Sequence, residues 1–182
     1  MLPIIIDIEA SGFGRDSYPI EVGVILPDRQ CFCRIIKPAA HWTFWDKSAE
    51  AVHGISRQLL LDKGKPPEQV ADELNRLLKG RRIYTDAWSH DISWIGKLYD
   101  LTGIPQLFTL DSLRSLISEQ QVLLWQPTKA QVIAELKLAR HRASTDAMIL
   151  QETFRRTHER CADTDHAKYA LDTNPDAGTR LR

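Results

Sequence analysis

Two carboxylates stand at the end of an apolar run near the start of the chain. Asp7 and Glu9 follow residues 2–6, with Ile8 between them, and a run of this length and composition is typical of a strand covered on both faces. Side chains alternate between faces along a strand, so Asp7 and Glu9 project to the same side. Two like charges there repel each other, and burial adds a desolvation cost. Taken alone, the motif favours the simpler interpretation that both acids lie in solvent past the end of the strand.

Two further acids favour a metal site. Asp91 precedes Trp94 and Ile95 by three and four residues, and Asp146 precedes Leu150 by four, so each acid extends the inward stripe of an expected helix. Both also fall in a first turn, where the helix dipole favours an anion, and ordinary N-terminal acids therefore remain an alternative. Four converging carboxylates can be held together only by cations. Mg²⁺ and Mn²⁺, which prefer carboxylate and water ligands, are the natural choice.

One histidine lies close to this set in the sequence. His141 precedes Asp146 by five residues, in the loop before the last expected helix. A lone histidine is usually structural or solvated. One that is tethered near a metal ligand is a candidate general base.

The elements that would position these residues predict one α/β domain. The first three expected strands are joined by short loops, which favours an antiparallel meander, and the order of elements is βββ-α-β-α-β-α-α. Residues 161–182 lose the apolar pattern and predict a loosely structured C-terminal tail. The expected strands cover 2–8, 20–26, 31–36, 83–85 and 108–110; the expected helices are a short one ending at Gly54, one from Pro67 to Gly80, and others over 91–101, 128–139 and 144–160.

Composition excludes several classes of protein. The 182 residues suffice for one domain with a substantial core, and no run approaches the roughly 18 apolar residues of a membrane span. Because 24 basic residues balance 24 acidic ones, nucleic acid would have to be held by a local patch or by metal ions. Three cysteines form neither a disulfide framework nor a zinc spacing, and no signal-peptide pattern precedes the first strand. We therefore expect a cytoplasmic protein with no membrane partner.

Three segments together resemble a known family. IIIDIEASG, WSHDISWI and HRASTDAMIL are similar to the three motifs of the DnaQ-like 3′–5′ exonucleases, in the histidine variant of the DEDD group, and IEVGVI and VHGIS agree with it. The resemblance implies a ribonuclease H-like fold. This is an α/β fold with a central five-stranded mixed sheet, made of a three-stranded antiparallel meander and two parallel strands, flanked by helices. We therefore expect an exonuclease domain over residues 1–160, followed by the tail over 161–182.

The sequence departs from the family pattern near the second motif and inside the first. The family often has Thr at the position of Ala10, and Asn and Phe at the positions of Ala87 and His90. The Gly-Asn-Ser pattern of oligoribonucleases is absent from the second motif, so that subtype is not assigned. These departures leave the metal ligands intact and weaken inference about how the terminal base and sugar are held.

The chemistry that the resemblance implies is hydrolysis with two Mg²⁺ or Mn²⁺ ions, releasing nucleoside 5′-monophosphates from a 3′ end. Asp7, Glu9 and Asp146 would hold the first ion, and Asp7 would bridge to the second. Asp91 would act mostly through metal-bound water. His141 would take the proton of the attacking water. The two ions, about 3.5–4 Å apart, would stabilise the attacking and leaving oxygens.

Substrate contacts are expected around these ligands. The backbone near Gly12 would approach the terminal nucleotide, and Arg140 and Arg142 would meet phosphates, although a solvated pair is an equally good interpretation of the two arginines. His53 would have a supporting role. The full set of candidate substrate-binding residues is Ala10, Ser11, Gly12, His53, Trp88, His90, Arg140 and Arg142.

The leading hypothesis is therefore a 3′–5′ exonuclease on single-stranded nucleic acid, with RNA and DNA both open. The alternative of another class is a catalytically inactive nucleic-acid-binding or scaffold protein of the same fold. A ribonuclease H-type endonuclease is a third, and it predicts internal cuts. Small relatives of the family often dimerise, so a homodimer is carried as an expectation.

Overall fold

A computed structural model describes residues 1–137 and 140–172, with side chains up to residue 162. Five strands form one mixed sheet in the order β3-β2-β1-β4-β5. Their bounds are β1 Ile5–Ala10, β2 Pro19–Ile25, β3 Cys31–Ile35, β4 Arg82–Thr85 and β5 Thr109–Ser112. The first three strands pair antiparallel, whereas β4 joins β1, and β5 joins β4, in parallel. The meander and the two parallel strands are therefore confirmed.

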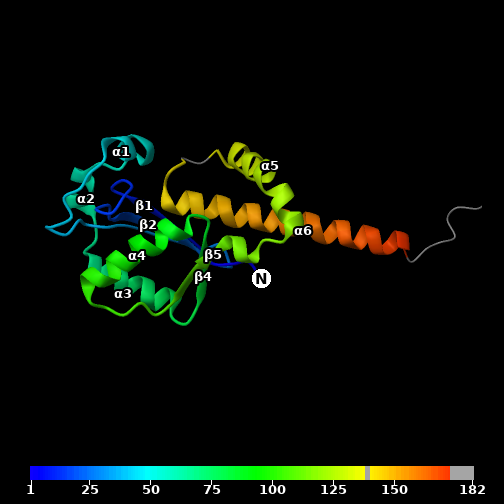
Figure 1. Ribbon diagram of the computed structural model, residues 1–182, viewed down its shortest axis with the longest axis horizontal. Coiled ribbons are helices and arrows are strands. Elements are labelled where there is room, and N and C mark those ends of the chain that lie inside the picture. The colour runs from blue at the N-terminus through cyan, green and yellow to red at the C-terminus, as the bar shows by residue number, and fades with distance from the viewer. Residues whose placement is uncertain (138–139, 173–182) are drawn as a thin grey trace, which may run out of the picture.

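Helices cover both faces of this sheet (Figure 1). Two of them, α3 and α4, lie on one face, and α6 lies across β1 and β2 on the other with α5 beside it. The helices are α1 Lys47–His53, α2 Arg57–Lys63, α3 Pro67–Leu78, α4 Trp88–Thr102, the 3-10 turn η1 Leu113–Leu116, α5 Glu119–Leu136 and α6 Ala143–Asp172.

The alternation along β1 sorts its side chains between two cores. Ile4, Ile6 and Ile8 join the main core, whereas Ile5 packs with Ala147 and Leu150 of α6. Asp7 and Glu9 share the face of Ile5, so β1 directs them toward the start of α6.

Local sequence signals set several helix ends as expected. Gly54 adopts a left-handed conformation, with φ 69°, at the end of α1. The Ser56 side chain accepts a hydrogen bond from the Leu59 amide at the start of α2. The helix from Pro67 and the helix around Asp91 are also present.

A helix was predicted over 128–139, but α5 runs over Glu119–Leu136. A capping box formed by Ser118 and Gln121 begins it nine residues earlier, and Pro127 lies inside it. The helix therefore contains a proline, although proline is unfavourable in a helix interior. Residues 138–139 lie outside the described part of the chain.

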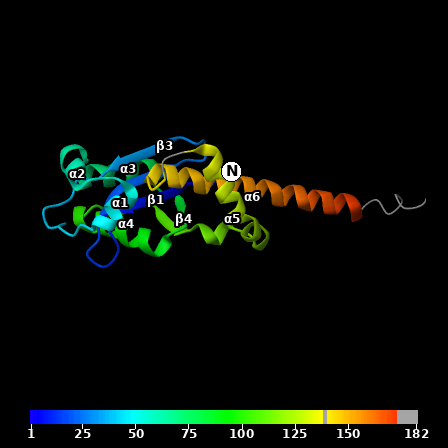
Figure 2. The same cartoon turned by 90° about the horizontal axis from the view of Figure 1, so that it is seen from above.

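The prediction of a loose tail from residue 161 is wrong as far as Asp172, because α6 continues twelve residues beyond the predicted end at Arg160. The extension projects away from the rest of the described chain in two perpendicular views (Figures 1 and 2). A helix that leaves the domain needs no apolar stripe, so the loss of pattern did not mean loss of helix. The predicted tail over 173–182 lies outside the described residues. None of the helices in the described segments combines the length and apolar character that a membrane crossing requires.

Candidate active site

Three acids from two distant segments converge where β1 meets α6. Carboxylate oxygens of Asp7, Glu9 and Asp146 lie within 4.8 Å of one another. Asp7 and Glu9 stand on β1, and Asp146 is in the first turn of α6. Oxygen ligands in such a group suit a hard divalent cation, because Mg²⁺ and Mn²⁺ prefer carboxylates.

Asp91 approaches the same place from α4. It is 1% exposed, and one of its oxygens accepts a hydrogen bond from the Thr85 hydroxyl at the end of β4. It lies outside the group of three oxygens, yet its charge raises the pKa of Asp7 and it lines the same pocket. The parallel pairing of β1 with β4 brings Asp91 here, because the helix after β4 begins beside the carboxyl end of β1.

Crowding and burial make these acids reluctant to ionise. Burial, followed by the charge of Asp91, raises the pKa of Asp7 well above its usual value. Burial and the charge of Asp146 raise the pKa of Glu9 to about 7. Burial likewise raises the pKa of Asp91 to about 7, against the lowering effect of the Thr85 hydrogen bond. A divalent cation among these carboxylates would reverse that cost.

Asp146 is held by the loop that precedes α6. Its Oδ1 accepts a hydrogen bond from Arg140 Nε at 2.9 Å, and its Oδ2 accepts one from the His141 backbone N–H at 3.1 Å. His141 has a left-handed backbone, with φ 60°, and it lines the same pocket as Asp7 and Asp91. The five residues predicted to do the chemistry are therefore neighbours in space.

The pocket beside these acids has a volume of about 400 Å³. One wall is aromatic: His90 stacks on Trp94 with ring centroids 5.6 Å apart, and Phe13 meets the edge of His90 at 5.5 Å. The lining also includes His53, whose Nδ1 accepts a hydrogen bond from the Ile55 amide at 3.0 Å. A larger, more open hollow of about 810 Å³ nearby contains none of the converging acids.

His53 is 6% exposed, and its Nε2 has no hydrogen-bond partner among the described residues. Burial lowers the pKa of this histidine. A neutral, buried imidazole with a free nitrogen beside a pocket is suited to a hydrogen bond with a bound molecule.

The other predicted substrate contacts divide into two groups. Ala10, Gly12 and His90 line the pocket, whereas Ser11 and Trp88 do not. A side chain on Gly12 would lie 2.7 Å from Asp46 Cβ, so the chain passes closely here. The Ser11 hydroxyl accepts from the Tyr18 amide at 3.1 Å, and the Trp88 indole donates to the Leu110 carbonyl at 3.3 Å. Both bonds tie the side chains to the protein.

The two arginines beside His141 also have protein partners. Arg140 pairs with Asp146, and Arg142 pairs with Glu21 on β2. No role was predicted for Glu21 or Phe13. An acid inside the apolar strand PIEVGVI and an aromatic residue in the turn SGFG were the available signals.

Solved structures of exonuclease I share this architecture. Exonuclease I from Methylocaldum szegediense matches with a TM-score of 0.64 over 85% of this chain and 39% of its own, at 13% sequence identity. Exonuclease I of E. coli, in complex with a 5cy-dA13 oligonucleotide, matches with a TM-score of 0.62 over 88% of this chain and 42% of its own, also at 13% identity. The chain has the ribonuclease H-like fold of exonuclease I.

This likeness to exonuclease I concerns the fold, and the chain spans about two fifths of the length of these exonuclease I chains. No protein-family model matches the chain, and no curated protein matches it. The functional conclusion must therefore come from the site itself.

Proposed function

We propose that this protein is a metal-dependent 3′–5′ exonuclease of the histidine-variant DEDD type, acting on single-stranded nucleic acid. The observation that carries the proposal is the convergence of Asp7, Glu9 and Asp146 within 4.8 Å, beside a pocket that Asp91 and His141 also line. The exonuclease I fold supports it, because E. coli exonuclease I, which has this fold, is known in complex with 5cy-dA13 and dA16 oligonucleotides.

The donor set fits two Mg²⁺ or Mn²⁺ ions, which would be held by Asp7, Glu9, Asp91 and Asp146. Bound there, they would supply Lewis-acid stabilisation of the attacking and leaving oxygens. The raised pKa values support this assignment, because carboxylates crowded at the cost of their ionisation are typical of a cation site.

His141 would accept the proton of the attacking water at a ring nitrogen. A base of this kind contributes about 10²–10⁴-fold to the rate. The left-handed backbone of His141 and the hydrogen bond from its N–H to Asp146 fix the residue close to the acids.

The 400 Å³ pocket is of the size that binds one small ligand, and the terminal nucleotide would occupy it. Phe13 and His90 would stack on its base, which is typically worth about 1–3 kcal/mol per base. His53 Nε2 would bond the sugar or phosphate. Release of a nucleoside 5′-monophosphate would follow.

A ladder assay tests the proposal. Single-stranded DNA and RNA oligomers of one sequence, labelled at the 5′ end, are incubated with Mg²⁺ or Mn²⁺. We expect products that shorten by one nucleotide at a time, and no cutting of a closed single-stranded circle. Asp7→Asn should abolish the ladder. Glu68→Gln, at an exposed acid in the first turn of α3, is the matched control and should leave it unchanged. Cutting of the circle would instead identify an endonuclease.

The Arg140–Asp146 ion pair favours a second candidate, a binding or scaffold protein without chemistry, because it occupies one of the acids that a metal would need. In that case the oligomers would be retained by the protein in a filter-binding assay and released intact. Dimerisation remains a prediction, and light scattering of the purified chain would test it.

A further inference from the structure

Glu21 is a fully buried carboxylate that the proposed chemistry does not use. It stands on β2 and is 0% exposed. It is directly opposite Glu9 in the β1–β2 ladder, so both side chains lie on the face of the sheet that α6 covers. A buried charge is costly unless it is paired and hydrogen-bonded, so the partners of Glu21 indicate what it does.

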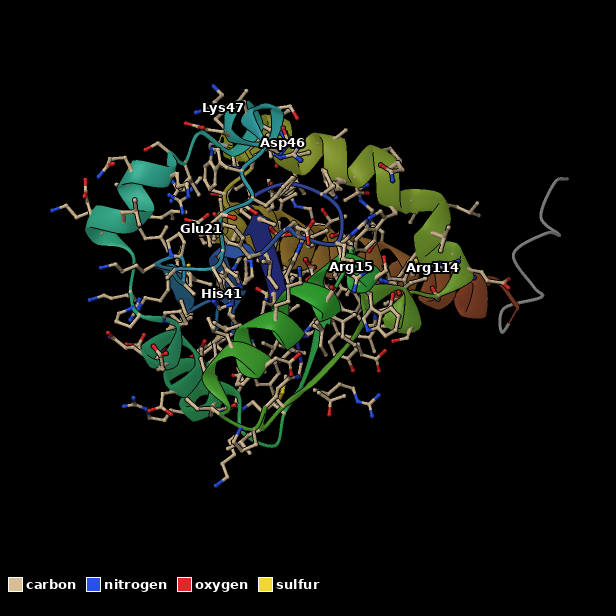
Figure 3. The ribbon with its side chains drawn as sticks, turned by 60° about the vertical axis from the view of Figure 1, so that its left-hand side comes forward. Arg15, Glu21, His41, Asp46, Lys47 and Arg114 are labelled. Carbon is tan, nitrogen blue, oxygen red and sulfur yellow. The ribbon has the colours of Figure 1, made fainter. Side chains whose placement is uncertain are left out.

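Most of these partners come from the end of the loop that precedes α6 and from the first residue of α6. Arg142 Nε donates to both carboxylate oxygens of Glu21 at 3.1 Å, and its terminal nitrogen donates as well. The backbone N–H of Ala143 donates to Oε2 at 2.9 Å. The Cys33 thiol of β3, at 3.5 Å, completes the set. Charge-assisted bonds from a guanidinium and an amide fix direction as well as distance. Figure 3 shows Glu21 beside the blue strands of the sheet, whereas Lys47 stands beside α1.

Gly23, two residues further along β2, leaves room for this contact because it has no side chain. A side chain there would lie 2.2 Å from Ser144 N and 2.3 Å from Ala143 C. The start of α6 therefore rests directly on the backbone of β2. Gly23 is opposite Asp7 in the ladder, so this contact is made beside the two acids of β1.

The segment held in this way carries two residues of the proposed site. Asp146 donates its backbone N–H to the Arg142 carbonyl at 2.9 Å, and it accepts a hydrogen bond from the His141 N–H at 3.1 Å. Arg142 lies between His141 and Ala143 in the chain, so the bridge to Glu21 fixes the residue that follows the histidine. A shift of Arg142 would move both His141 and Asp146.

We infer that Glu21 is a positioning residue that sets His141 and Asp146 against Asp7 and Glu9. The inference rests on the proposed nuclease function. It assigns the buried ion pair a role in placing the site, since such pairs often contribute little net stability. Arg142 on this account does not contact substrate, because Glu21 holds its guanidinium.

A matched control for Glu21 exists on α6, the helix that carries Asp146. Glu152 of α6 is 5% exposed and pairs with Arg29, Arg155 and Arg156 at 2.7 Å. It has the same chemistry as Glu21, a buried acid with arginine partners, but it lies away from the converging acids. If the Glu21 ion pair were merely structural, its loss should change kcat and the melting temperature in the same way as loss of the Glu152 ion pairs.

The experiment compares Glu21→Gln with Glu152→Gln by steady-state kinetics on a single-stranded oligomer. Misplacement of catalytic groups by about 1 Å can cost 10²-fold, so we expect kcat of Glu21→Gln to fall about 10–100-fold with KM within about threefold of the wild type. Glu152→Gln should lower the melting temperature and keep the wild-type kcat. Equal kcat in all three proteins would overturn the inference, and so would losses of kcat that follow the melting temperature in both variants.

A second readout needs no activity. Amide hydrogen exchange of the metal-free protein is measured in a peptide covering residues 140–147. Exchange should speed up in Glu21→Gln and stay at the wild-type rate in Glu152→Gln. If the wild-type chain releases no nucleotides, the proposed function fails, and the exchange comparison still decides whether Glu21 holds this segment. An unchanged exchange rate in Glu21→Gln would refute the claim that Glu21 fixes this segment.

Arg142→Gln breaks the same ion pair and replaces Glu21→Gln if that variant fails to fold. It is the milder change, because the Arg142 side chain is 44% exposed. It should lower kcat to a similar extent without raising KM, and the double variant should show no further loss. A rise in KM alone would identify Arg142 as a phosphate contact and overturn the assignment. If the fold-losses of kcat in the two single variants multiply in the double variant, the assignment is overturned as well.

Discussion

Replacing Glu9 by glutamine should stabilise the metal-free protein while it removes activity. Burial, together with the charges of Asp146 and Glu21, raises the pKa of Glu9 from 4.5 to about 7. Each tenfold change in proton affinity corresponds to about 1.4 kcal/mol, so the ionised carboxylate costs the folded state at most about 3 kcal/mol. Glutamine has nearly the same shape and carries no charge, so it avoids this cost.

The direction of the pH dependence follows from the raised pKa. Below pH 4.5 the carboxyl is protonated in both the folded and the unfolded chain, and Glu9 imposes no penalty. As the pH rises from 4.5 to about 7, the unfolded chain loses this proton first, so the free energy of unfolding of the wild type falls. The advantage of Glu9→Gln should therefore be absent well below pH 4.5, grow to at most about 3 kcal/mol as the pH rises to about 7, and be constant above pH 8.

Urea denaturation in EDTA at several pH values measures this difference. Glu68→Gln, at an exposed acid on α3, should stay within about 0.5 kcal/mol of the wild type throughout. Saturating Mn²⁺ should narrow the difference, because a ligand at one hundred times its Kd adds about 2.7 kcal/mol to the protein that binds it. A Glu9→Gln protein that is less stable than the wild type at pH 8 in EDTA would refute the reasoning about crowded carboxylates.

Three further predictions concern the pocket, the helix contact and the ion pairs. Phe13→Ala, at a side chain 69% exposed, should raise KM for an oligomer about 5–100-fold through lost stacking and leave the melting temperature unchanged, as kinetics and thermal melting would show. Gly23→Ala should destabilise the fold by several kcal/mol in urea denaturation and remove activity, because the added carbon would lie 2.2 Å from Ser144 N. Glu152→Gln should cost about 3 kcal/mol near neutral pH. The pKa of Glu152 is lowered to about 2, chiefly by the hydrogen bond from Arg155, so this difference should disappear as the pH falls from 4.5 through 2 in acid denaturation.

The acids of the site could be predicted because their signal is local. Asp7 and Glu9 interrupt an apolar strand, and Asp91 and Asp146 extend inward helix stripes, so each is anomalous within a few residues of itself. The antiparallel meander could be predicted equally well, since short turns between consecutive strands leave few alternative ways to pair them. The addition of two parallel strands to the meander was implied by the family resemblance, and the parallel pairing of β1 with β4 accounts for the position of Asp91 in the fold.

Two elements were misjudged because local rules were applied where tertiary contacts decide. The apolar pattern placed this helix over 128–139, yet the capping box at Ser118 and packing against α6 extend α5 back to Glu119, through Pro127. The end of the apolar stripe near Arg160 suggested a tail, but an apolar stripe reports what a helix packs against. It does not report how far the helix continues, and α6 reaches Asp172.

The partner of Glu21 is an example of a contact that a single sequence does not predict. An acid flanked by Ile20, Val22 and Val24 in a strand buried along its whole length must have a cationic or amide partner, and that much follows from the cost of a buried charge. The chain offers 24 lysines and arginines, and nothing local distinguishes Arg142 among them. The choice is made by the register that sets Glu21 opposite Glu9, and by Gly23, which admits α6 to the face of β2. Residues that do chemistry can be found by their type, whereas residues that place them are found only once the strands are paired.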